Sequence, residues 1–168
     1  MICPSCGFEN IQGVDECENC GADLRSSDIP TPSTALEANL VDVPLAAVRH
    51  HTPLTISPDA TAAEAVQQMQ GAAVGCLVVE DATGLRGILS ERDLLMKLPG
   101  LTLDGITVAE LMTPDPVVLR ANDSIAVAIN KMAVGGFRHI PLVADGQVTG
   151  IVSARDIFRH ILAQLTRR

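Results

Sequence analysis

The chain has 168 residues and a formal net charge of −8, and 47% of its residues are hydrophobic but only 2% are aromatic, with neither Trp nor Tyr. This length predicts one globular domain, or one domain with a small module, built around an aliphatic core. The acidic balance and the lack of stacking aromatics argue against nucleic acid and anionic membrane surfaces as partners.

The first residues, MICPSCG, lack the basic and apolar regions of a signal peptide. No apolar run in the sequence approaches the roughly 20 residues that span a bilayer. We therefore expect a cytoplasmic protein without a membrane partner.

Residues 1–25 contain two C-x-x-C-G motifs, with Cys3 and Cys6 in the first and Cys17 and Cys20 in the second. A C-x-x-C turn brings two thiolates to one metal, and the following glycine lets backbone N–H groups approach the sulfur atoms. So short a segment buries too little surface to fold alone, and the metal must supply stability. We predict a closed, structural zinc site. Iron is the alternative, because rubredoxin centres use the same ligands, but aromatic residues surround those centres.

The pattern C-P-x-C-G-x-x-N…C-x-x-C-G-A-x-L resembles the short zinc ribbons that open many prokaryotic regulatory proteins. Within residues 1–25, Arg25 is the one basic residue against five acidic ones. We therefore expect the ribbon to contact a protein partner or a second subunit and not nucleic-acid phosphate. Residues 26–42 are rich in Ser, Thr and Pro and are predicted to be a linker.

From residue 43 onward the chain repeats itself without a gap, at the constant offset that pairs Gly87 with Gly150. We call this offset the repeat shift. The clearest copies are GILSERD at 87–93 and GIVSARD at 150–156. The repeat shift also pairs Pro53 with Pro116, Ala65 with Ala128 and Met69 with Met132. The sequence thus predicts repeat 1 at 43–103 and repeat 2 at 104–168.

Repeat 1 is predicted to fold in the order β-α-β-β-α. A short strand at 53–56 precedes a helix that begins with a Thr-x-x-Glu capping box at 61–64. Continuous apolar runs at 76–80 and 85–89 predict strands that are buried on both faces. A second helix begins near Glu91.

Repeat 2 is predicted to follow the same order. A strand at 116–119 precedes a helix that Asp123 or Ser124 caps. Two strands follow at 139–143 and 148–152, and the last helix begins near Ala154.

These repeats resemble the CBS domain in its usual tandem pair, the Bateman module. The resemblance rests on the Pro-led first strand, the helix that ends in Met, FRHIPLV at 137–143, and the Gly-apolar-apolar-Ser-x-Arg-Asp motif before the last helix. It covers about residues 44–165. It implies a mixed α/β (α+β) fold in which two units pack by their sheets and leave two clefts for an adenosine ligand. Such pairs commonly dimerise, so we expect a homodimer.

The Ser-x-Arg-Asp motifs carry the candidate ligand chemistry. Each begins a helix, where free N–H groups and the positive end of the helix dipole attract anions. Serine and arginine can donate to phosphate, and aspartate can accept hydrogen bonds from ribose hydroxyls. The candidate residues are Ser90, Arg92 and Asp93 in repeat 1, and Ser153, Arg155 and Asp156 in repeat 2.

His139 is the seventh candidate. The resemblance implies that the histidine of an H-x-P motif faces a phosphate, and only repeat 2 has this motif, because Cys76 and Val78 occupy the equivalent positions in repeat 1. This difference favours the cleft of repeat 2. We expect Cys76 to be a buried core thiol.

No catalytic residue is predicted. His50 and His51 lie in a loop and His160 lies on the last helix, where we expect it to be solvated. None of them has a recognisable spacing from a nucleophile or a carboxylate, and no phosphate-binding glycine loop is present.

The leading hypothesis is a non-enzymatic regulatory module that binds AMP, ADP or ATP and relays binding to a partner through the ribbon. Because Ser-x-x-Asp is also an ordinary helix capping box, a structural adaptor without a ligand stays open. Sensors of S-adenosylmethionine or NAD are further alternatives, although two arginine-bearing motifs favour a phosphorylated ligand. A DNA-associated regulator is disfavoured by the acidic charge.

Overall fold

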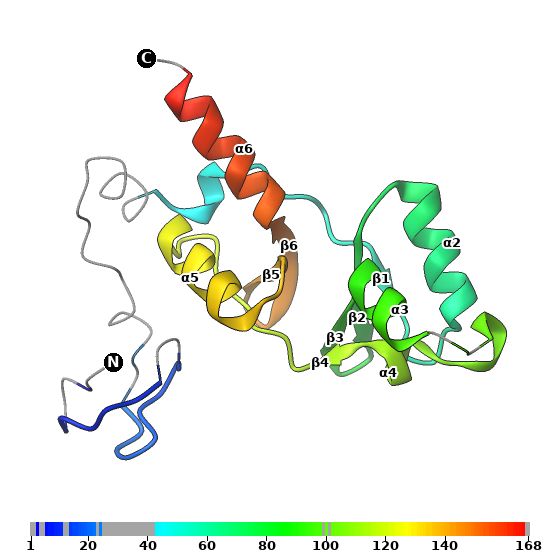
Figure 1. The fold of residues 1–168 in the computed structure, drawn as a ribbon, viewed down its shortest axis with the longest axis horizontal. Coiled ribbons are helices and arrows are strands. Elements are labelled where there is room, and N and C mark those ends of the chain that lie inside the picture. The colour runs from blue at the N-terminus through cyan, green and yellow to red at the C-terminus, as the bar shows by residue number, and fades with distance from the viewer. Residues whose placement is uncertain are drawn as a thin grey trace. The chain divides into compact units, whose positions relative to one another are not determined.

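The computed structural model describes residues 3, 6–11, 14–22, 24, 43–98, 100 and 102–166 (Figure 1). The chain divides into two compact units. Unit 1 is made of Met1–Arg49, Leu119–Arg138 and Val152–Arg168, and unit 2 of His50–Val118 and His139–Ile151. The predicted linker, 26–42, lies outside the described residues. Within the described residues no helix is long and apolar enough to cross a membrane.

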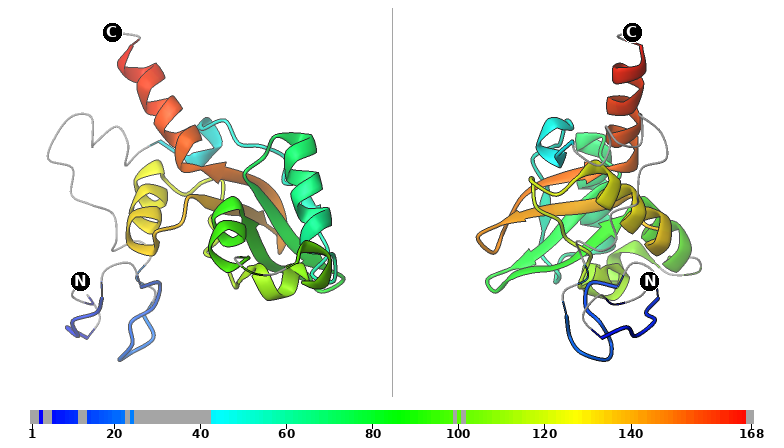
Figure 2. Two further views of the ribbon diagram at one scale, coloured as in Figure 1. Left: turned by 45° about the vertical axis from the view of Figure 1, so that its right-hand side comes forward. Right: turned by 90° about the vertical axis from the view of Figure 1, so that its left-hand side faces the viewer.

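Unit 2 contains a four-stranded sheet in the order β1-β2-β3-β4. Its strands are β1 (Thr55–Ile56), β2 (Cys76–Asp81), β3 (Gly84–Ser90) and β4 (Thr113–Pro114). Strand β1 runs parallel to β2, whereas β2 and β3, and β3 and β4, pair antiparallel. Figures 1 and 2 show helices α2 (Ala62–Ala72) and α3 (Glu91–Lys97) beside this sheet.

The core of unit 2 lies between the sheet and these helices. Its residues are Ile56, Ala62, Ala65, Met69, Leu77, Val79, Leu89, Leu94, Val108 and Leu111. The first four residues of β2 are all buried, which explains why this strand is a continuous apolar run in the sequence. The capping box at Thr61 and Glu64 is confirmed, because each side chain bonds the backbone N–H of the other residue.

Unit 1 contains helices α5 (Ile125–Gly135) and α6 (Ala154–Leu165), which pack against each other, and the 3-10 turn η1 (Leu45–Ala47). The cap of α5 is Ser124, whose Oγ accepts a hydrogen bond from the Val127 N–H at 3.3 Å. Buried side chains from all three elements, including Leu45, Ile125 and Ile157, form the apolar interior of this unit.

Strands β5 (His139–Ala144) and β6 (Gln147–Ser153) form a second, two-stranded sheet. They are joined by Asp145 and Gly146, which both have positive φ, 50° and 76°. Two successive left-handed residues suit a tight hairpin turn. This confirms the predicted strand pair of repeat 2.

In unit 1, the first residues of repeat 1 pack on the residues that lead into the first helix of repeat 2. The Leu45 N–H donates to the Asp123 carbonyl and the Ala46 N–H to the Ala121 carbonyl, each at 2.8 Å. The start of repeat 1 is therefore bound to residues just before α5, which lie far away in sequence.

In unit 2, the first residues of repeat 2 make the matching contacts with repeat 1. The Val108 N–H donates to the Ala60 carbonyl at 2.8 Å and the Ala109 N–H to the Pro58 carbonyl at 2.9 Å. The repeat shift relates these bonds, residue by residue, to those of unit 1. The first residues of each repeat thus pack on the other repeat.

This exchange explains the repeated glycine of the two heptapeptides. A Cβ at Gly87 would lie 2.8 Å from the Thr113 carbonyl oxygen, and a Cβ at Gly150 would lie 3.0 Å from Cδ2 of His50. The repeat shift also pairs His50 with Thr113. A side chain at Gly87 would collide with the backbone that crosses the sheet there, and one at Gly150 would crowd the His50 ring.

One predicted strand is wrong. The structure assigns no strand to 116–119, where Leu119 alone forms a β-bridge, and β4 at Thr113–Pro114 pairs with β3 instead. The reason is local: Asp115 has a positive φ of 44°, which turns the chain, and Pro116 has no N–H to donate to a sheet. The structure also adds the short elements η2 (Leu103–Gly105) and α4 (Val108–Leu111), which the repeat pattern did not predict.

Candidate functional site

The start of α3 presents the repeat 1 motif. Ser90 caps the helix, because its Oγ accepts from the Asp93 N–H at 3.3 Å. In return, Asp93 Oδ2 accepts from the Ser90 N–H at 2.9 Å and from the Ser90 hydroxyl at 2.5 Å. The serine and aspartate therefore form a complete capping box, with Arg92 exposed between them.

The start of α6 repeats this geometry in unit 1. Ser153 Oγ accepts from the Asp156 N–H at 3.2 Å, and Asp156 Oδ2 accepts from the Ser153 N–H at 3.1 Å and from its hydroxyl at 2.5 Å. Asp156 is buried, with 6% of its surface exposed, and Arg155 is exposed. Both predicted motifs thus place a hydroxyl, a guanidinium and a carboxylate at a helix start.

The aspartate of repeat 1 has further partners. Oδ1 of Asp93 accepts from the Thr113 hydroxyl at 3.1 Å and pairs with Lys97 Nζ at 3.3 Å. Burial opposes ionisation of Asp93, but the bonds from Ser90, Thr113 and Lys97 outweigh it and hold its pKa below the usual value. Both oxygens of this carboxylate are engaged within unit 2.

Lys97 also donates to the carbonyls of Leu111 and Met112, at 2.6 and 3.1 Å, and so ties α3 to α4. The repeat places His160 at the position equivalent to Lys97. The prediction of a solvated His160 is wrong, because its Nε2 atom is buried and has no hydrogen-bond partner among the residues that the structure describes. The shorter imidazole side chain does not reproduce the contacts of the lysine.

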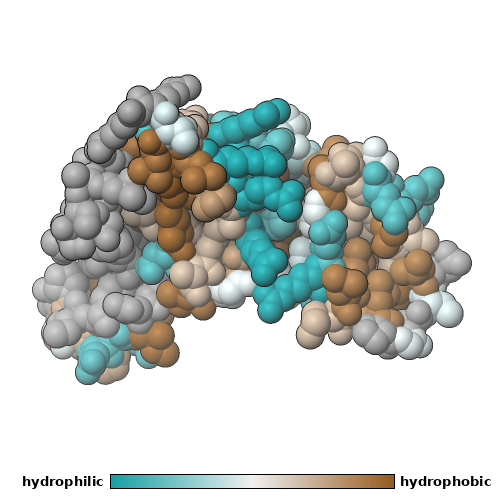
Figure 3. All heavy atoms as spheres, turned by 45° about the horizontal axis from the view of Figure 1, so that its top comes forward, coloured by the Kyte–Doolittle hydropathy of each residue, from teal (hydrophilic) through white to brown (hydrophobic). Residues whose placement is uncertain are grey.

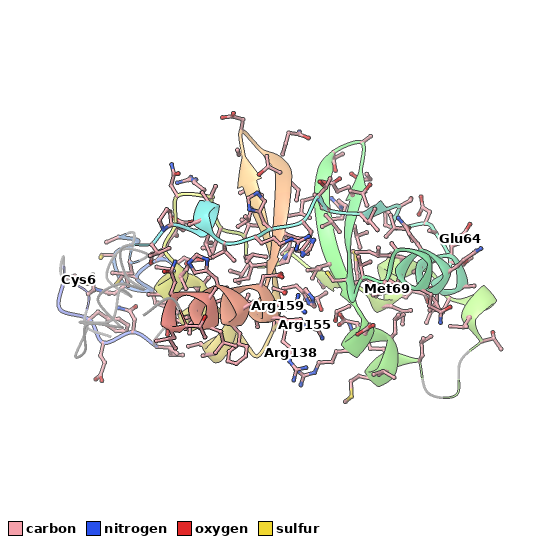
Figure 4. The ribbon with its side chains drawn as sticks, turned by 90° about the horizontal axis from the view of Figure 1, so that it is seen from above. Cys6, Glu64, Met69, Arg138, Arg155 and Arg159 are labelled. Carbon is pink, nitrogen blue, oxygen red and sulfur yellow. The ribbon has the colours of Figure 1, made fainter. Side chains whose placement is uncertain are left out.

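Unit 1 adds two arginines that the sequence reasoning missed, Arg138 and Arg159. Arg155 and Arg159 are one turn apart and share a face of α6. The Arg138 carbonyl accepts from the Ala154 N–H at 2.9 Å, which fixes Arg138 at the start of the same helix. Figure 4 labels Arg155 and Arg159 on α6 and Arg138 near the start of that helix. Comparison of the repeats could have found them, because Gly75 is equivalent to Arg138.

His139 begins β5 and belongs to unit 2. A Cβ at Gly75 would lie 3.9 Å from its Cε1 and 3.3 Å from Glu91 Oε2, and the Gly75 carbonyl accepts from the Glu91 N–H at 3.1 Å. The imidazole thus lies near the start of α3. Ser153 belongs to unit 1, so the predicted grouping of His139 with the repeat 2 motif stays a prediction.

Cys76 is buried, as predicted, with 7% of its surface exposed. Burial, helped by the negative charge of Asp93, raises the pKa of its thiol to about 12. A thiol with so high a pKa is protonated at neutral pH and is a poor nucleophile.

A hollow of about 710 Å³ lies between α2 and α3 in unit 2. Its lining is mainly apolar and includes Val66, Met69, Leu94 and Leu95, with Glu91 as its one charged group. A phosphorylated ligand would meet no cation there, so this hollow suits an apolar surface and not the nucleotide.

The four N-terminal cysteines meet in space. Their sulfur atoms all lie within 4.8 Å of one another, with Cys3 and Cys20 separated by 3.7 Å and Cys6 and Cys17 by 3.6 Å. A tetrahedral site with Zn–S bonds of about 2.3 Å has S···S separations of about 3.8 Å. The cysteine cluster therefore fits one tetrahedral metal ion.

The surrounding backbone also suits thiolates. Burial raises the pKa of Cys17, but N–H groups of Cys20 and Asn19 and the Asn10 amide outweigh burial and bring its pKa to about 6. The Asn10 amide lies 3.5 Å from Cys17 Sγ, and its oxygen accepts from the Glu18 N–H at 3.0 Å. Asn10 is 4% exposed and joins the two knuckles.

Comparison with known proteins locates the repeats independently. A family profile described as "CBS domain" matches residues 45–100 and again 108–163. The Arabidopsis thaliana protein "CBS domain-containing protein CBSCBSPB5" is 34% identical over 118 residues, which is 68% of this chain. The match covers 21% of that relative, so the chain spans about a fifth of its length.

Solved structures share the fold. The structure titled "CBS domain, NE2398" has a TM-score of 0.64 and 29% identity, and the match covers 67% of this chain and 89% of that one. The CBS domain pair of protein MJ0100, solved with 5′-methylthioadenosine and S-adenosyl-L-methionine, has a TM-score of 0.66 at 22% identity, with 73% and 98% coverage. The second likeness concerns the fold alone.

Proposed function

This chain belongs to the CBS-domain family, and we propose that it is a non-enzymatic regulatory module that binds an adenine nucleotide, AMP, ADP or ATP. The observation that carries the proposal is the pair of helix starts that repeat one hydroxyl-guanidinium-carboxylate geometry, at Ser90 and at Ser153. Two equivalent anion-attracting helix starts in one chain suit the sugar-phosphate part of a nucleotide.

The start of α6 is the favoured site. Helix α6 carries two arginines where α3 carries one. In this site Asp156 would accept from the ribose hydroxyls, and Ser153 and Arg155 would donate to phosphate. At the start of α3, Arg92 and His139 would likewise donate hydrogen bonds to phosphate.

Arginines also bear on the choice among adenosine ligands. Protein MJ0100, which shares the fold, was solved with 5′-methylthioadenosine and S-adenosyl-L-methionine, neither of which has a phosphate. Guanidinium groups at the helix starts would find no anion of that kind in such ligands. For this chain we therefore favour a nucleotide over S-adenosylmethionine.

The ribbon would hold zinc through Cys3, Cys6, Cys17 and Cys20 and would pass the effect of binding to a protein partner. Four cysteine ligands leave no open position on a tetrahedral zinc ion, so the metal would be structural. Zinc is favoured over iron because the described part of the ribbon has Phe8 as its one aromatic side chain.

A cytoplasmic homodimer would cover the apolar surface that the chain exposes. On α3, Leu95 and Met96 are 76% and 72% exposed beside the apolar hollow, and on α6 Phe158 is 60% exposed. Figure 3 shows apolar side chains, in brown, open to solvent on one face of the molecule. Exposed apolar surface of this kind marks a contact with another protein, here a second copy.

Calorimetry tests the proposal. Wild-type protein is titrated with AMP, ADP, ATP, NAD and S-adenosylmethionine, beside Asp156→Ala and the control Asp145→Ala, which lies in a hairpin turn. We expect at least one adenine nucleotide to bind below millimolar, and binding to be lost only in Asp156→Ala. The sensor hypothesis fails if no compound binds.

A structural adaptor is the second candidate, because both Ser-Asp pairs form complete capping boxes without any ligand. In that case the ribbon would be the active part. Removal of residues 1–25 would then abolish partner capture, whereas Asp156→Ala would lower only stability.

A further inference from the structure

We propose that helix α5 of repeat 2 is the docking surface of the metal-loaded ribbon, so that loss of the metal releases the ribbon and uncovers Lys131. The ribbon and α5 both belong to unit 1. This surface involves no residue of the proposed nucleotide site. Its use rests on the part of the proposed function in which the four cysteines hold a metal.

The contact between the ribbon and α5 is an ion pair. Nζ of Lys131 lies 2.5 Å from Oδ1 of Asp15, and the two residues are 116 positions apart in the chain. Lys131 is only 5% exposed. Because an ammonium group that leaves water needs an opposite charge close by, a lysine this deeply buried on α5 depends on the carboxylate that the ribbon brings to it.

The position of Asp15 is set by the fold of the ribbon. The Asp15 carbonyl accepts from the Leu24 N–H at 2.8 Å, and Leu24 is buried against Cys3 and Cys17. Three buried residues make too small a core to be stable without a metal. The Asp15 carboxylate is therefore held toward α5 only while the four cysteines keep their metal.

Comparison of the two repeats gives independent support. The repeat shift pairs Lys131 with Gln68 of α2, and Val127 with Glu64. The two positions are four residues apart and share one face of the helix. The ribbon, residues 1–25, has five acidic residues and one basic residue, so Glu64 would repel it, whereas Lys131 attracts it. Repeat 2 thus has a docking face for an acidic segment that repeat 1 lacks.

Docking and metal binding are then thermodynamically coupled. If the metal favours the docked ribbon, the docked ribbon must favour the metal by the same factor. Lys131 contributes no ligand atom to the cysteine cluster, yet its removal should weaken metal binding. It is a positioning residue for the ribbon, and it ties the metal state of the ribbon to repeat 2.

The first test measures how reactive the lysines are. Lys97 and Lys131 are the two lysines of the chain, and the side chain of Lys97 is 40% exposed. The full chain is treated briefly with an amine-acetylating reagent, either loaded with zinc or after a chelator has removed it, and the acetyl groups are located by mass spectrometry. Lys131 should react about tenfold faster without zinc, because only the undocked population reacts, and Lys97 should react equally fast in both states.

Two variants show whether Asp15 is responsible. Asp15→Asn should make Lys131 reactive even with zinc bound, whereas the matched control Glu16→Gln, an exposed acid next to Asp15, should leave it protected. Docking is refuted if Lys131 reacts at one rate with and without zinc. It is also refuted if both lysines become reactive together, since repeat 1 would then unfold along with the ribbon.

The second test measures zinc affinity by competition with a chelating dye. Lys131→Gln introduces the residue of repeat 1, and Gln is a good helix former, so α5 should stay folded. This variant should bind zinc about tenfold more weakly. Arg120→Gln removes the same charge from an exposed position of unit 1 and should bind zinc like wild-type protein.

The results distinguish the docking from the metal site on which it rests. Equal zinc affinity of wild-type protein and Lys131→Gln overturns the coupling and leaves the four-cysteine site standing. Failure of wild-type protein to bind zinc refutes both. Neither test involves a nucleotide, so the adenine-nucleotide proposal stands or falls separately.

Discussion

The ion pair between the ribbon and α5 leads to the most specific stability prediction. Lys131 on α5 is buried, with 5% of its surface exposed, and its Nζ lies 2.5 Å from Oδ1 of Asp15. Asp15 is held by the second knuckle, where its carbonyl accepts from the Leu24 N–H at 2.8 Å. Asp15→Asn removes the carboxylate that offsets a buried ammonium.

The expected loss of stability follows from how far the side chains of Lys131 and Asp15 are exposed. Removal of one partner from a fully buried pair costs about 3–5 kcal/mol, whereas an exposed pair contributes below about 1 kcal/mol. The side chain of Asp15 is 51% exposed and water screens part of the interaction. We therefore expect Asp15→Asn to lower the free energy of unfolding by about 2 kcal/mol.

Urea unfolding followed by circular dichroism measures this change, because the chain has no Trp or Tyr for fluorescence. With a slope of about 2 kcal/mol per molar urea, the midpoint should fall by about 1 M. Glu16→Gln removes an exposed charge beside Asp15 and should change little. Lys131→Gln introduces the residue that repeat 1 has at Gln68 and should cost less than Asp15→Asn, since no buried charge is left.

Removal of the metal distinguishes loss of the Asp15–Lys131 ion pair from the effect of the changed net charge. Without metal the ribbon has too small a core to hold Asp15 in place. Asp15→Asn should therefore have the same stability as wild-type protein once a chelator has removed the metal. A difference that persists in chelator, or a midpoint shift below about 0.2 M in the metal-loaded protein, would refute the role of this ion pair.

Three further predictions concern the metal, the core and acid stability. Cys17→Ser should lose the bound metal, which native mass spectrometry would count, and retention of one zinc ion per chain would contradict a site built from all four cysteines. Leu77→Ala should cost about 2–5 kcal/mol in urea unfolding, because Leu77 is 0% exposed in the core of unit 2; a cost below about 1 kcal/mol would contradict its place there. The folded-state pKa of Asp93 is lowered, so its stabilising effect is complete above the unfolded value near 3.9 and is lost as the pH falls through the folded pKa. Asp93→Asn should therefore have a lower free energy of unfolding than wild-type protein at pH 7, and this difference should become smaller below about pH 4. A difference in unfolding free energy that does not change with pH would contradict the lowered pKa of Asp93.

Much of the fold could be predicted because the same local signals occur in both repeats. The strands at 76–80 and 139–143, and the helix starts at Glu91 and Ala154, agree with the structure to within a residue or two. Apolar runs and capping residues are local signals, and each was present in both copies. The strand at 116–119 failed because Asp115 adopts a left-handed conformation, which a non-glycine residue rarely does.

Contacts between distant segments could not be predicted in the same way. The repeat shift does not say whether Leu45 packs on its own repeat or on the other, and the structure places it against Asp123. The pairing of Asp15 with Lys131 likewise joins residues 116 positions apart. The same holds for the site: its Ser-x-Arg-Asp motifs were visible in the sequence, and a comparison of the repeats marks Arg138 as different from Gly75, but only the fold shows that Arg138 lies at the start of α6.

The most direct test of the account is a crystal structure of the chain with bound ATP. The account predicts ribose hydroxyls within hydrogen-bond distance of the Asp156 carboxylate and phosphate oxygens on Ser153 and Arg155. ATP located away from the start of α6, or a crystal grown at saturating ATP in which that helix start is covered by the protein's own side chains, would contradict it.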